Sequence, residues 1–526
     1  MAVRKVAHPS VDDRQAQGLA ARDRAALSSH ARWRPAADRP DPVALLEEQD
    51  ADREPDLVPV RHGRMAVSPF TFYRGAARVM AEDLKDTPVA GLQAQLCGDA
   101  HLSNFGLFAS PERILLFDVN DFDETLPGPF EYDVERMSAS FTVAGRGNGF
   151  SPADVRTATL ASVRAYRKAM ASFAQLGTMD VWYARLDEDE LMASIQAAVA
   201  GTASQVEAAR KLEQADKTKA DKTKAGKSKP GKSKAGQKQA SQLPKQEKAD
   251  VEREKASKQA EKVAAKTAQK AHASDSSQAL SKLGELVDGQ YRITSQPPLI
   301  VPVRDLASTF GLSPDQVMPA LHDQFRAYRD TLQDDRRRLL ERFEVVDMAR
   351  KVVGVGSVGT RCYIVLLQGR DAQDPLFLQV KQATASVLEA SLRRSRYRQH
   401  GERVVQGQRM MQSASDIYLG WTKGLGPDAR RHFYWRQLRD MKGSVEIDKL
   451  RPVGLALYAG ICGWTLARAH ARSGDPVAIA EYLGDSDAFD KSITDFSERY
   501  ADQNERDYAR FVKAIRSGRL AAVTGV

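Results

Sequence analysis

Apolar residues form strand-length runs in two separate parts of the chain. In the first part, residues 105–117, FGLFASPERILLF, two apolar runs flank a polar turn and predict a pair of strands. In the second, residues 351–369, KVVGVGSVGTRCYIVLLQG, two runs flank a glycine turn, and residues 375–381 and 432–440 predict two more strands. The pattern therefore predicts two β units that lie far apart in the sequence.

Helical spacing dominates the rest of the chain. Residues 68–84 begin with Ser68-Pro69, a suitable cap and first turn, and residues 135–175 and 306–343 continue the helical pattern. Two further helices are predicted at 402–415 and 455–475. We expect an α+β fold in which a small β-rich unit lies between helical blocks.

A tract from about residue 205 to residue 280 is rich in Lys, Ala, Gln and Ser and has few large apolar residues. Such a segment buries too little surface to offset its chain entropy, so we expect an insertion that is disordered or a solvated helix. Residues 201–280 carry 19 Lys and Arg against 10 Asp and Glu, an excess that equals the +9 of the whole chain. Nucleic acid or another anionic partner is therefore expected only through this tract, and a plain solvated linker is the alternative.

The remaining composition narrows the class of protein. Cys97, Cys362 and Cys462 are far apart and have no zinc-binding spacing, which fits a reducing compartment. The longest apolar run, residues 453–467, is shorter than the ~20 residues of a spanning helix, and no signal-peptide pattern is present. The sequence predicts a cytoplasmic protein without a membrane partner.

Acidic residues gather around the first pair of predicted strands, in CGDAHLSNFGLFASPERILLFDVNDFDET. Asp99 is five residues before Asn104, and Asp118, Asp121 and Asp123 come after the strand hairpin. One carboxylate that accepts a proton, with an Asn and a second carboxylate that hold Mg²⁺, is the arrangement of kinase-type phosphoryl transfer. Asp and Asn are also common in turns, so the pattern alone is weak.

The glycine turn Gly354, Gly356 and Gly359 offers a second element of the same chemistry. Its glycines allow the backbone to approach phosphates, and its place between two strands favours a kinase-type loop over a dinucleotide-binding turn, in which the third glycine opens a helix. A structural hairpin is the alternative. Lys381, at the end of the next strand, is a candidate to pair with phosphates, or it is an edge-strand Lys that deters aggregation.

These elements occur in the reverse of the usual kinase order, because Asp99 precedes Gly354. We therefore predict a protein-kinase-like two-lobe fold that is circularly permuted, with the catalytic loop before the glycine-loop lobe. The predicted division follows from these patterns. It comprises a mobile arm (1–60), a helical catalytic-loop part (61–204), the Lys-rich insertion (205–280), a helical segment (281–343), a β-rich nucleotide-binding lobe (344–445) and a helical remainder (446–526).

Six separated blocks carry a resemblance to a known family. They are GDAHLSNFG, FDVNDFDETLPGPFEYDVERMSAS, SPFTFYRGAA, GVGSVGTRCYIVLL, RVVQGQRMMQSASDIYLGW and LARAHARSGD. From about Val60 to Leu520, except for the Lys-rich tract, the chain resembles the bacterial domain-of-unknown-function family 2252. That family is grouped with the protein-kinase-like superfamily, near aminoglycoside and choline phosphotransferases, and its substrate is not established.

The resemblance implies roles for single residues. Asp99 would be the catalytic base, Asn104 a Mg²⁺ ligand and Asp121 the second ligand, with Asp118 as the rival one register shift away. Asp133 would brace the catalytic loop. His101 would contact phosphate or steady its loop. Glu389 would pair with Lys381, with Glu402 as the competitor.

The expected function is an ATP- and Mg²⁺-dependent phosphotransferase whose acceptor is unknown, with a small molecule favoured over a protein. Transfer of a nucleotidyl group at the same site is a variant. The alternatives are a non-catalytic nucleotide-binding or scaffold protein and, suggested by Gly98-Asp99-Ala100-His101, a metallophosphoesterase, although the chain has only nine His.

Overall fold

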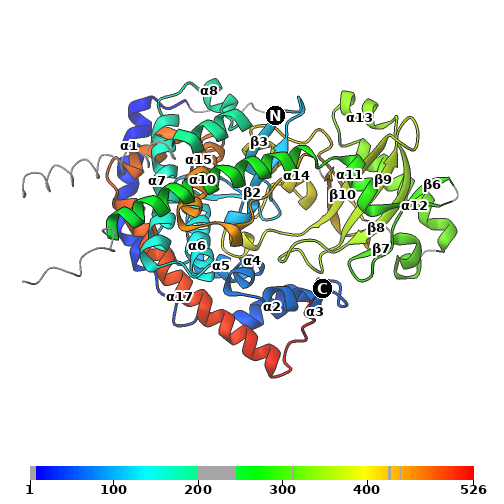
Figure 1. Cartoon of the computed structure of the whole chain (residues 1–526), viewed down its shortest axis with the longest axis horizontal. Helices are drawn as coiled ribbons and strands as arrows, with labels where there is room; N and C mark the ends of the chain where they lie inside the picture. The colour runs from blue at the N-terminus through cyan, green and yellow to red at the C-terminus, as the bar shows by residue number, and fades with distance from the viewer. Residues whose placement is uncertain are drawn as a thin grey trace, which may run out of the picture.

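The structure is a computed structural model that describes residues 8–197, 245–287, 289–310, 313–424, 428–438 and 440–525. Helices occupy one side of the molecule and a six-stranded sheet the other, as Figure 1 shows. The mixed α+β class that the sequence predicts is confirmed.

The N-terminal region is folded where the structure describes it, so the prediction of a mobile arm over residues 1–60 is wrong from residue 8 onward. Its helices are α1 (Val11–Arg24), α2 (Pro42–Asp50), α3 (Val58–Met65), α4 (Pro69–Gly75) and α5 (Ala77–Leu84). The few apolar side chains here pack on distant elements, as Trp33 does against Tyr500 in α17 (Ala488–Arg516). A scan of the local pattern misses such packing because the partners lie hundreds of residues away.

The first predicted strand pair forms, and a second pair encloses it in sequence. β2 (Phe105–Ala109) pairs with β3 (Leu115–Val119), and β1 (Gln93–Leu96) pairs with β4 (Leu126–Pro129), both antiparallel. The pairing of β1 with β4 and of β2 with β3 brings the connections 97–104 and 120–125 side by side.

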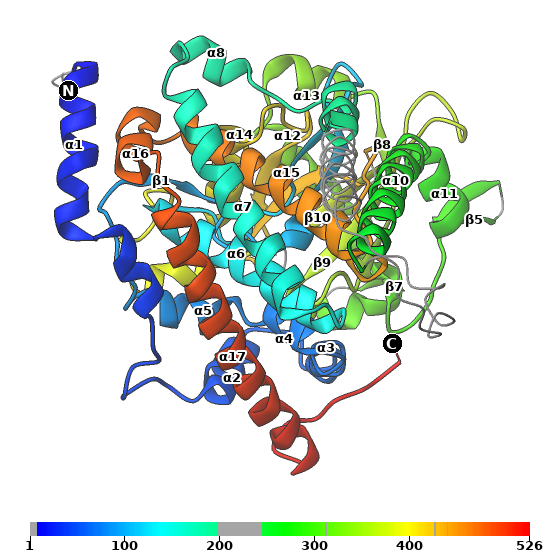
Figure 2. The ribbon, with the colours of Figure 1, turned by 60° about the vertical axis from the view of Figure 1, so that its left-hand side comes forward.

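The helical body surrounds α6 (Phe130–Gly147), which is buried on nearly all sides. Its other long members are α7 (Pro152–Phe173), α15 (Pro452–Ala471) and α17. α7 and α15 lie side by side (Figure 2), and a Cβ at Gly463 would meet the Ser162 carbonyl oxygen at 2.1 Å, so this close approach requires glycine. Two shorter helices, α8 (Thr178–Tyr183) and α16 (Pro476–Leu483), lie at the edge of the helical body. Among the helices of the described ranges, none is both long and apolar enough to cross a membrane.

The end of the predicted insertion belongs to the fold. Residues 198–244 lie outside the described part, but α10 (Lys245–His272) is a helix whose Ala268 and Ala271 are buried in the main core. α11 (Ser276–Leu283) then packs on the sheet. The predicted boundary at residue 280 is therefore too late, because alanine spacing is enough to bury one face of a Lys-rich helix.

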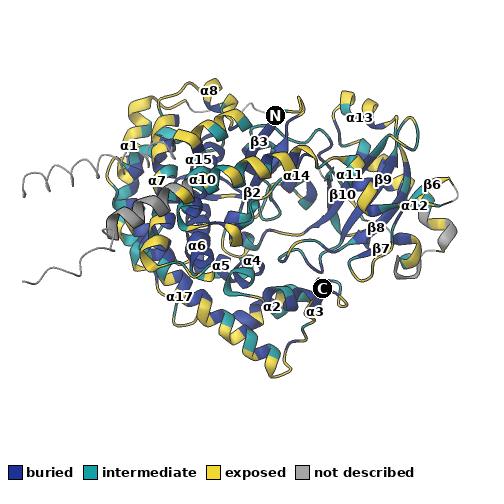
Figure 3. Cartoon of the chain, viewed as in Figure 1, coloured by how far each residue is buried: buried dark blue, intermediate teal, exposed yellow. Residues whose placement is uncertain are grey.

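The large sheet carries the glycine turn. Its antiparallel order is β11 (Gly420–Lys423), β12 (His432–Gln437), β10 (Pro375–Ala383), β9 (Cys362–Gln368), β8 (Glu344–Lys351) and β7 (Ile300–Pro302). α12 (Pro314–Arg329) covers the face of the sheet to which Leu378 and Val380 of β10 belong. α11 covers the opposite face, to which Phe377 belongs. Side chains alternate along a strand, so Lys381 lies on the Phe377 face of β10. The strands are buried, whereas the outer sides of α1 and α13 (Asp334–Leu340) are exposed (Figure 3).

Three elements complete the β-rich part. β5 (Gly284–Val287) and β6 (Gln290–Ile293) form a separate hairpin. α14 (His400–Met411) lies between β10 and β11 in the chain and contacts β12. The three cysteines are free and buried.

Candidate functional site

The connections 97–104 and 120–125 meet at Gly98. This residue has φ +83°, and a Cβ there would lie 2.2 Å from the Glu124 carbonyl oxygen, so both the backbone conformation and the close contact require glycine. The backbone N–H of Asn120 donates to the Asn104 carbonyl at 2.8 Å and ties the two loops together again. The acids of both loops are thus held close to one another.

Asp133, in the first turn of α6, holds the loop that carries Asp99. Its carboxylate accepts hydrogen bonds from the backbone N–H groups of Cys97 (2.7 Å) and Gly98 (3.0 Å), and His470 Nε2 lies 3.2 Å from it. These hydrogen bonds fix the start of the loop 97–104 against α6.

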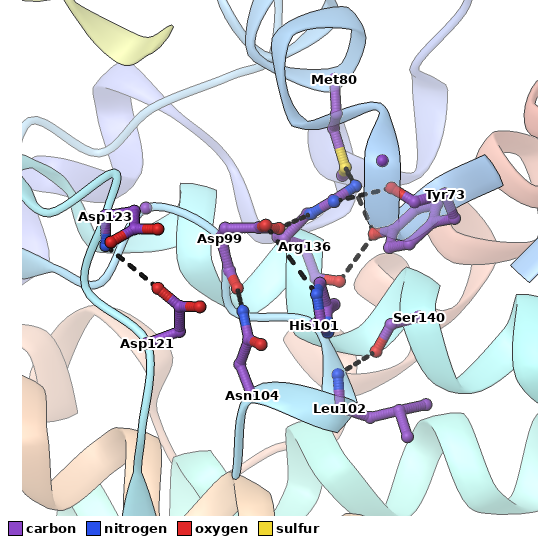
Figure 4. A network of polar contacts seen from close by, with 12 residues as sticks. Tyr73, Met80, Asp99, His101, Leu102, Asn104, Asp121, Asp123, Arg136 and Ser140 are labelled. Carbon is purple, nitrogen blue, oxygen red and sulfur yellow. Dashed lines mark hydrogen bonds and ion pairs between the residues drawn. The ribbon is translucent and has the colours of Figure 1, made fainter. Parts of the chain in front are cut away.

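Asp99 is the carboxylate at the centre of the polar network in Figure 4. Its Oδ1 accepts from Arg136 Nε at 2.7 Å, and its backbone carbonyl accepts from Asn104 Nδ2 at 2.7 Å. Burial raises the pKa of Asp99 above its ordinary value, although Arg136 opposes this shift. The Asn104 amide nitrogen is used in this hydrogen bond. Its side-chain oxygen is therefore the atom that could coordinate a metal ion.

His101 supports the same loop. Its Nε2 lies 3.8 Å from Asp99 Oδ2, and its buried Nδ1 has no hydrogen-bond partner within the described part of the chain. Burial lowers its pKa well below the ordinary value, and the positive charges of Arg74 and Arg136 add to this effect. Burial and the two guanidinium groups therefore disfavour the charged form of this ring.

Asp118, the rival of Asp121, points away from the open site. It is fully buried, forms an ion pair with Arg468 of α15, and accepts hydrogen bonds from the Ser413 backbone N–H (2.9 Å) and Oγ (3.0 Å). Its oxygens are occupied by protein donors. The structure therefore separates the two candidates: Asp121 borders the cavity, with its side chain 31% exposed, and Asp118 does not.

Lys381 joins this acidic region to the sheet. Its Nζ lies 2.6 Å from Asp123 Oδ2 and 4.0 Å from Asp121 Oδ2, and Tyr434 donates to Asp123 Oδ1 at 2.6 Å. Burial disfavours the charge on Lys381, but the two carboxylates outweigh it and raise its pKa. Burial likewise opposes the charge on Asp123, yet Lys381 and Tyr434 hold the pKa of Asp123 below its ordinary value.

The predicted partner of Lys381 is corrected. Among the residues that the structure describes, no ion pair joins Lys381 to Glu389 or Glu402. The charge of Glu389 acts instead on Arg403 and His400, where it opposes the lowering of their pKa by burial. A carboxylate close in sequence was preferred, whereas the fold supplies Asp123 from a position 258 residues earlier.

The glycine turn connects β8 to β9 and rests on the N-terminal helices. Gly354 (φ +66°) and Gly359 (φ +85°) need the left-handed conformation, and their carbonyls accept from Arg64 and from the Glu54 backbone. A Cβ at Gly356 would be 3.0 Å from the Arg74 carbonyl oxygen. The turn is therefore held against α3 and α4.

A cavity of about 810 Å³ connects these parts. Of the predicted residues, Asp99, Asp121, Gly356 and Glu389 line it. The other predicted residues are not among those that line it: Asn104, His101, Asp118, Asp133, Gly354, Gly359 and Lys381.

Four residues of the site were missed as site residues in the sequence. Asp123 and Glu124 are adjacent to Asp121, so the acidic run pointed to them. Burial raises the pKa of Glu124 to about 7 against the opposing charge of Arg403. Arg403 donates to the backbone carbonyls of Asp123 (2.7 Å) and Thr125 (2.6 Å). No local sequence pattern around Arg403 or Tyr434 indicates that either belongs to the site.

Magnesium is compatible with the donor set. Within the described ranges, no group of three or more His, Cys, Asp and Glu is placed to hold a metal ion. Mg²⁺ is usually held by one or two carboxylates together with substrate phosphates, so Asp121 and the Asn104 oxygen are donors of the right kind. A binuclear esterase centre needs a full set of protein ligands, and the described residues provide no such cluster of His, Cys, Asp and Glu.

The chain belongs to the bacterial family DUF2252, described as an uncharacterized protein conserved in bacteria. Residues 53–254 and 232–514 match that family, which confirms the family resemblance of the six sequence blocks. No curated protein and no solved structure matches the chain.

Proposed function

We propose that this protein is an ATP- and Mg²⁺-dependent phosphotransferase with a circularly permuted protein-kinase-like fold. The connectivity of the large sheet supports the proposal. Kinases place a glycine-rich loop between two strands, a Lys on the next strand and a helix after it. Here β8, the glycine turn, β9, β10 with Lys381, and α14 follow in that order.

The segment around β2 and β3 supplies the other half of the plan. Asp99 and Asn104 have the spacing of a kinase catalytic loop, and a strand pair then leads to Asp121, as a metal-binding Asp follows in kinases. The single observation that carries the proposal is the approach of Lys381 to this half, with Nζ 2.6 Å from Asp123 and 4.0 Å from Asp121. Two halves distant in sequence thus share one polar cluster.

In the proposed mechanism the chain mainly positions and neutralises charge. Lys381 and the backbone of the glycine turn hold the phosphates of the nucleotide, and Asp99 orients the acceptor hydroxyl and accepts its proton. Burial raises the pKa of Asp99, and a raised pKa makes its carboxylate a stronger base. Mg²⁺, when bound at Asp121 and Asn104, would neutralise phosphate charge.

Nucleotide binding tests the proposal. We expect ATP with Mg²⁺ to raise the melting temperature of the purified protein more than either alone, and Asp121→Asn to abolish that rise. The matched control is Glu48→Gln, which removes an exposed carboxylate that lines the same cavity from α2 and should leave the rise intact. No shift with ATP, GTP, ADP or AMP in folded wild-type protein would reject the phosphotransferase.

A further inference from the structure

An arginine-rich connection borders the same cavity as the carboxylates. It joins the short helix η4 (Val387–Ala390) to α14 and reads SLRRSRYRQ over residues 391–399. Arg394 and Arg398 line the cavity, as does Asp99. Within the described part of the chain, neither guanidinium makes a hydrogen bond or ion pair with protein.

Other arginines of the cavity wall are paired with carboxylates. Arg53 Nε lies 3.4 Å from Asp50 Oδ1. Arg78 donates to Glu82 Oε2 at 3.0 Å. At the exposed rim of this wall, no protein carboxylate among the described residues pairs with Arg394 or Arg398.

A third arginine of the wall, Arg74, lies deeper. Its Nε is buried without a hydrogen-bond partner in the described ranges, and its charge acts on Asp99 and Asp121. Burial lowers the pKa of Arg74, against the effect of those two carboxylates. Donors for an anion therefore extend from the rim of the cavity toward the catalytic carboxylates.

The arginine-rich connection is anchored at both ends. Before it, where η4 begins, the Ser386 hydroxyl donates to the Glu124 carbonyl and the Val387 N–H donates to the Glu124 carboxylate, each at 2.7 Å. At its end, Gln399 accepts from the Glu402 N–H at 2.8 Å and donates to the Thr422 carbonyl at 2.6 Å. The arginines are thus attached to the same loop that carries Asp121.

We propose that the acceptor carries an oxyanion, a phosphate monoester, beside its hydroxyl, and that Arg394 and Arg398 bind this group. The planar guanidinium presents paired donors that match a phosphate. A cavity of about 810 Å³ lies within the range of small-molecule sites, so the acceptor is a small phosphorylated alcohol. This inference rests on the proposed function for the identity of the transferred group, but the anion site itself can be tested without nucleotide.

The test uses inorganic phosphate as the probe, titrated against the full chain by calorimetry without nucleotide or Mg²⁺. Chloride keeps the ionic strength constant because screening alone changes weak anion binding. We expect millimolar binding by the wild type and at least a tenfold weaker Kd for Arg394→Gln/Arg398→Gln. The matched control, Arg393→Gln/Arg396→Gln, removes two charges of the same connection that do not line the cavity and should change the Kd less than twofold.

A second titration identifies the oxyanion and separates the two proposals. Glycerol 3-phosphate should bind at Arg394 and Arg398 more tightly than glycerate or glycerol, and equal binding of glycerate would overturn the phosphate assignment.

The arginine variant should retain the Mg²⁺-dependent thermal shift with ATP. Loss of that shift would assign these arginines to the nucleotide and overturn the inference. Absent phosphate binding, or equal effects of both double variants, would also overturn it. A wild type that binds phosphate through these arginines without responding to ATP would reject the phosphotransferase alone.

Discussion

Two Asp–Arg pairs, each with its Asp in the acidic stretch 97–125, differ in their access to the cavity. Asp118 and Arg468 are each about 1% exposed in their side chains, and further donors from Ser413 complete the environment of Asp118. Asp99 pairs with Arg136, but its side chain is 19% exposed and it lines the cavity. One pair is sealed in the core and the other is open to a ligand.

The difference teaches that a buried ion pair is not by itself a sign of a site. A sealed pair has all its oxygens and N–H groups engaged, so it has no capacity left for a substrate. An open pair keeps one carboxylate edge free while the other is held in position. The same residue types in the same short stretch of sequence thus serve stability in one case and, in our proposal, catalysis in the other.

The largest effect is expected from Asp118→Asn. It leaves the Arg468 charge in the core without a counter-charge and points amide hydrogens toward existing donors, so we expect a loss of about 3–5 kcal/mol in the free energy of unfolding. Urea denaturation followed by circular dichroism measures it. As a control, Asp495→Asn breaks a pair with Arg156 whose side chains are 42% and 40% exposed, and should cost under ~1 kcal/mol. Equal losses in both variants would contradict the distinction between sealed and open pairs.

Glu131→Gln examines a sealed carboxylate with no guanidinium partner in the described ranges. Burial raises the pKa of Glu131 to about 7 from an ordinary 4.5, so the native state holds a proton that the unfolded chain releases between these values. The stability of the wild type should therefore fall as the pH rises through this window. Gln can keep the hydrogen bond from the Ala90 N–H, which is 2.7 Å long, and removes the charge.

We expect the Glu131→Gln variant to match the wild type near pH 4.5 and to exceed it by up to about 3 kcal/mol above pH 7. Urea unfolding across this pH range measures the difference. A constant offset at every pH would show that the substitution acts through packing and not through the proton.

Asp99→Asn should cost less stability than Asp118→Asn, about 1–2 kcal/mol, because the Asn oxygen can still accept from Arg136 while its NH2 group faces the cavity. Arg136 also keeps its 2.8 Å hydrogen bond to the Tyr73 carbonyl and its stacking on the Tyr73 ring. If Asp99 is the base, ATP turnover should fall by about 10²–10⁴ while the thermal shift with ATP persists. An assay of ADP formation gives the turnover, because transfer to an alcohol releases ADP, and an unchanged rate would remove Asp99 from the mechanism.

Ser413→Ala is the mildest change. It deletes the 3.0 Å hydrogen bond from Oγ to Asp118 but leaves the 2.9 Å bond from the backbone N–H, so we expect a loss of about 1 kcal/mol. Chemical denaturation would detect this difference, and the control for loss of a hydroxyl is Ser391→Ala, which removes an exposed hydroxyl that has no hydrogen bond among the described residues. A loss as large as that of Asp118→Asn would mean that Ser413, and not Arg468, holds the buried carboxylate.

Much of the secondary structure could be predicted from local pattern. The glycine turn between β8 and β9, the strand that ends near Lys381 and the long helix α15 follow from runs and spacings that act over a few residues. The tertiary partners could not be predicted in the same way. Lys381 pairs with Asp123, and no rule of spacing connects positions 258 residues apart.

The amino-acid sequence by itself determined which acids gather in one stretch, where the glycines allow a turn and which family the chain belongs to. Only the tertiary structure decided which carboxylate is sealed and which is open. Asp118 and Asp121 are three residues apart, and the ion pair of the first with Arg468 in α15 depends on how a distant helix packs. The physical reason is that backbone preferences act locally, whereas the burial and pairing of a charge depend on every element that packs around it.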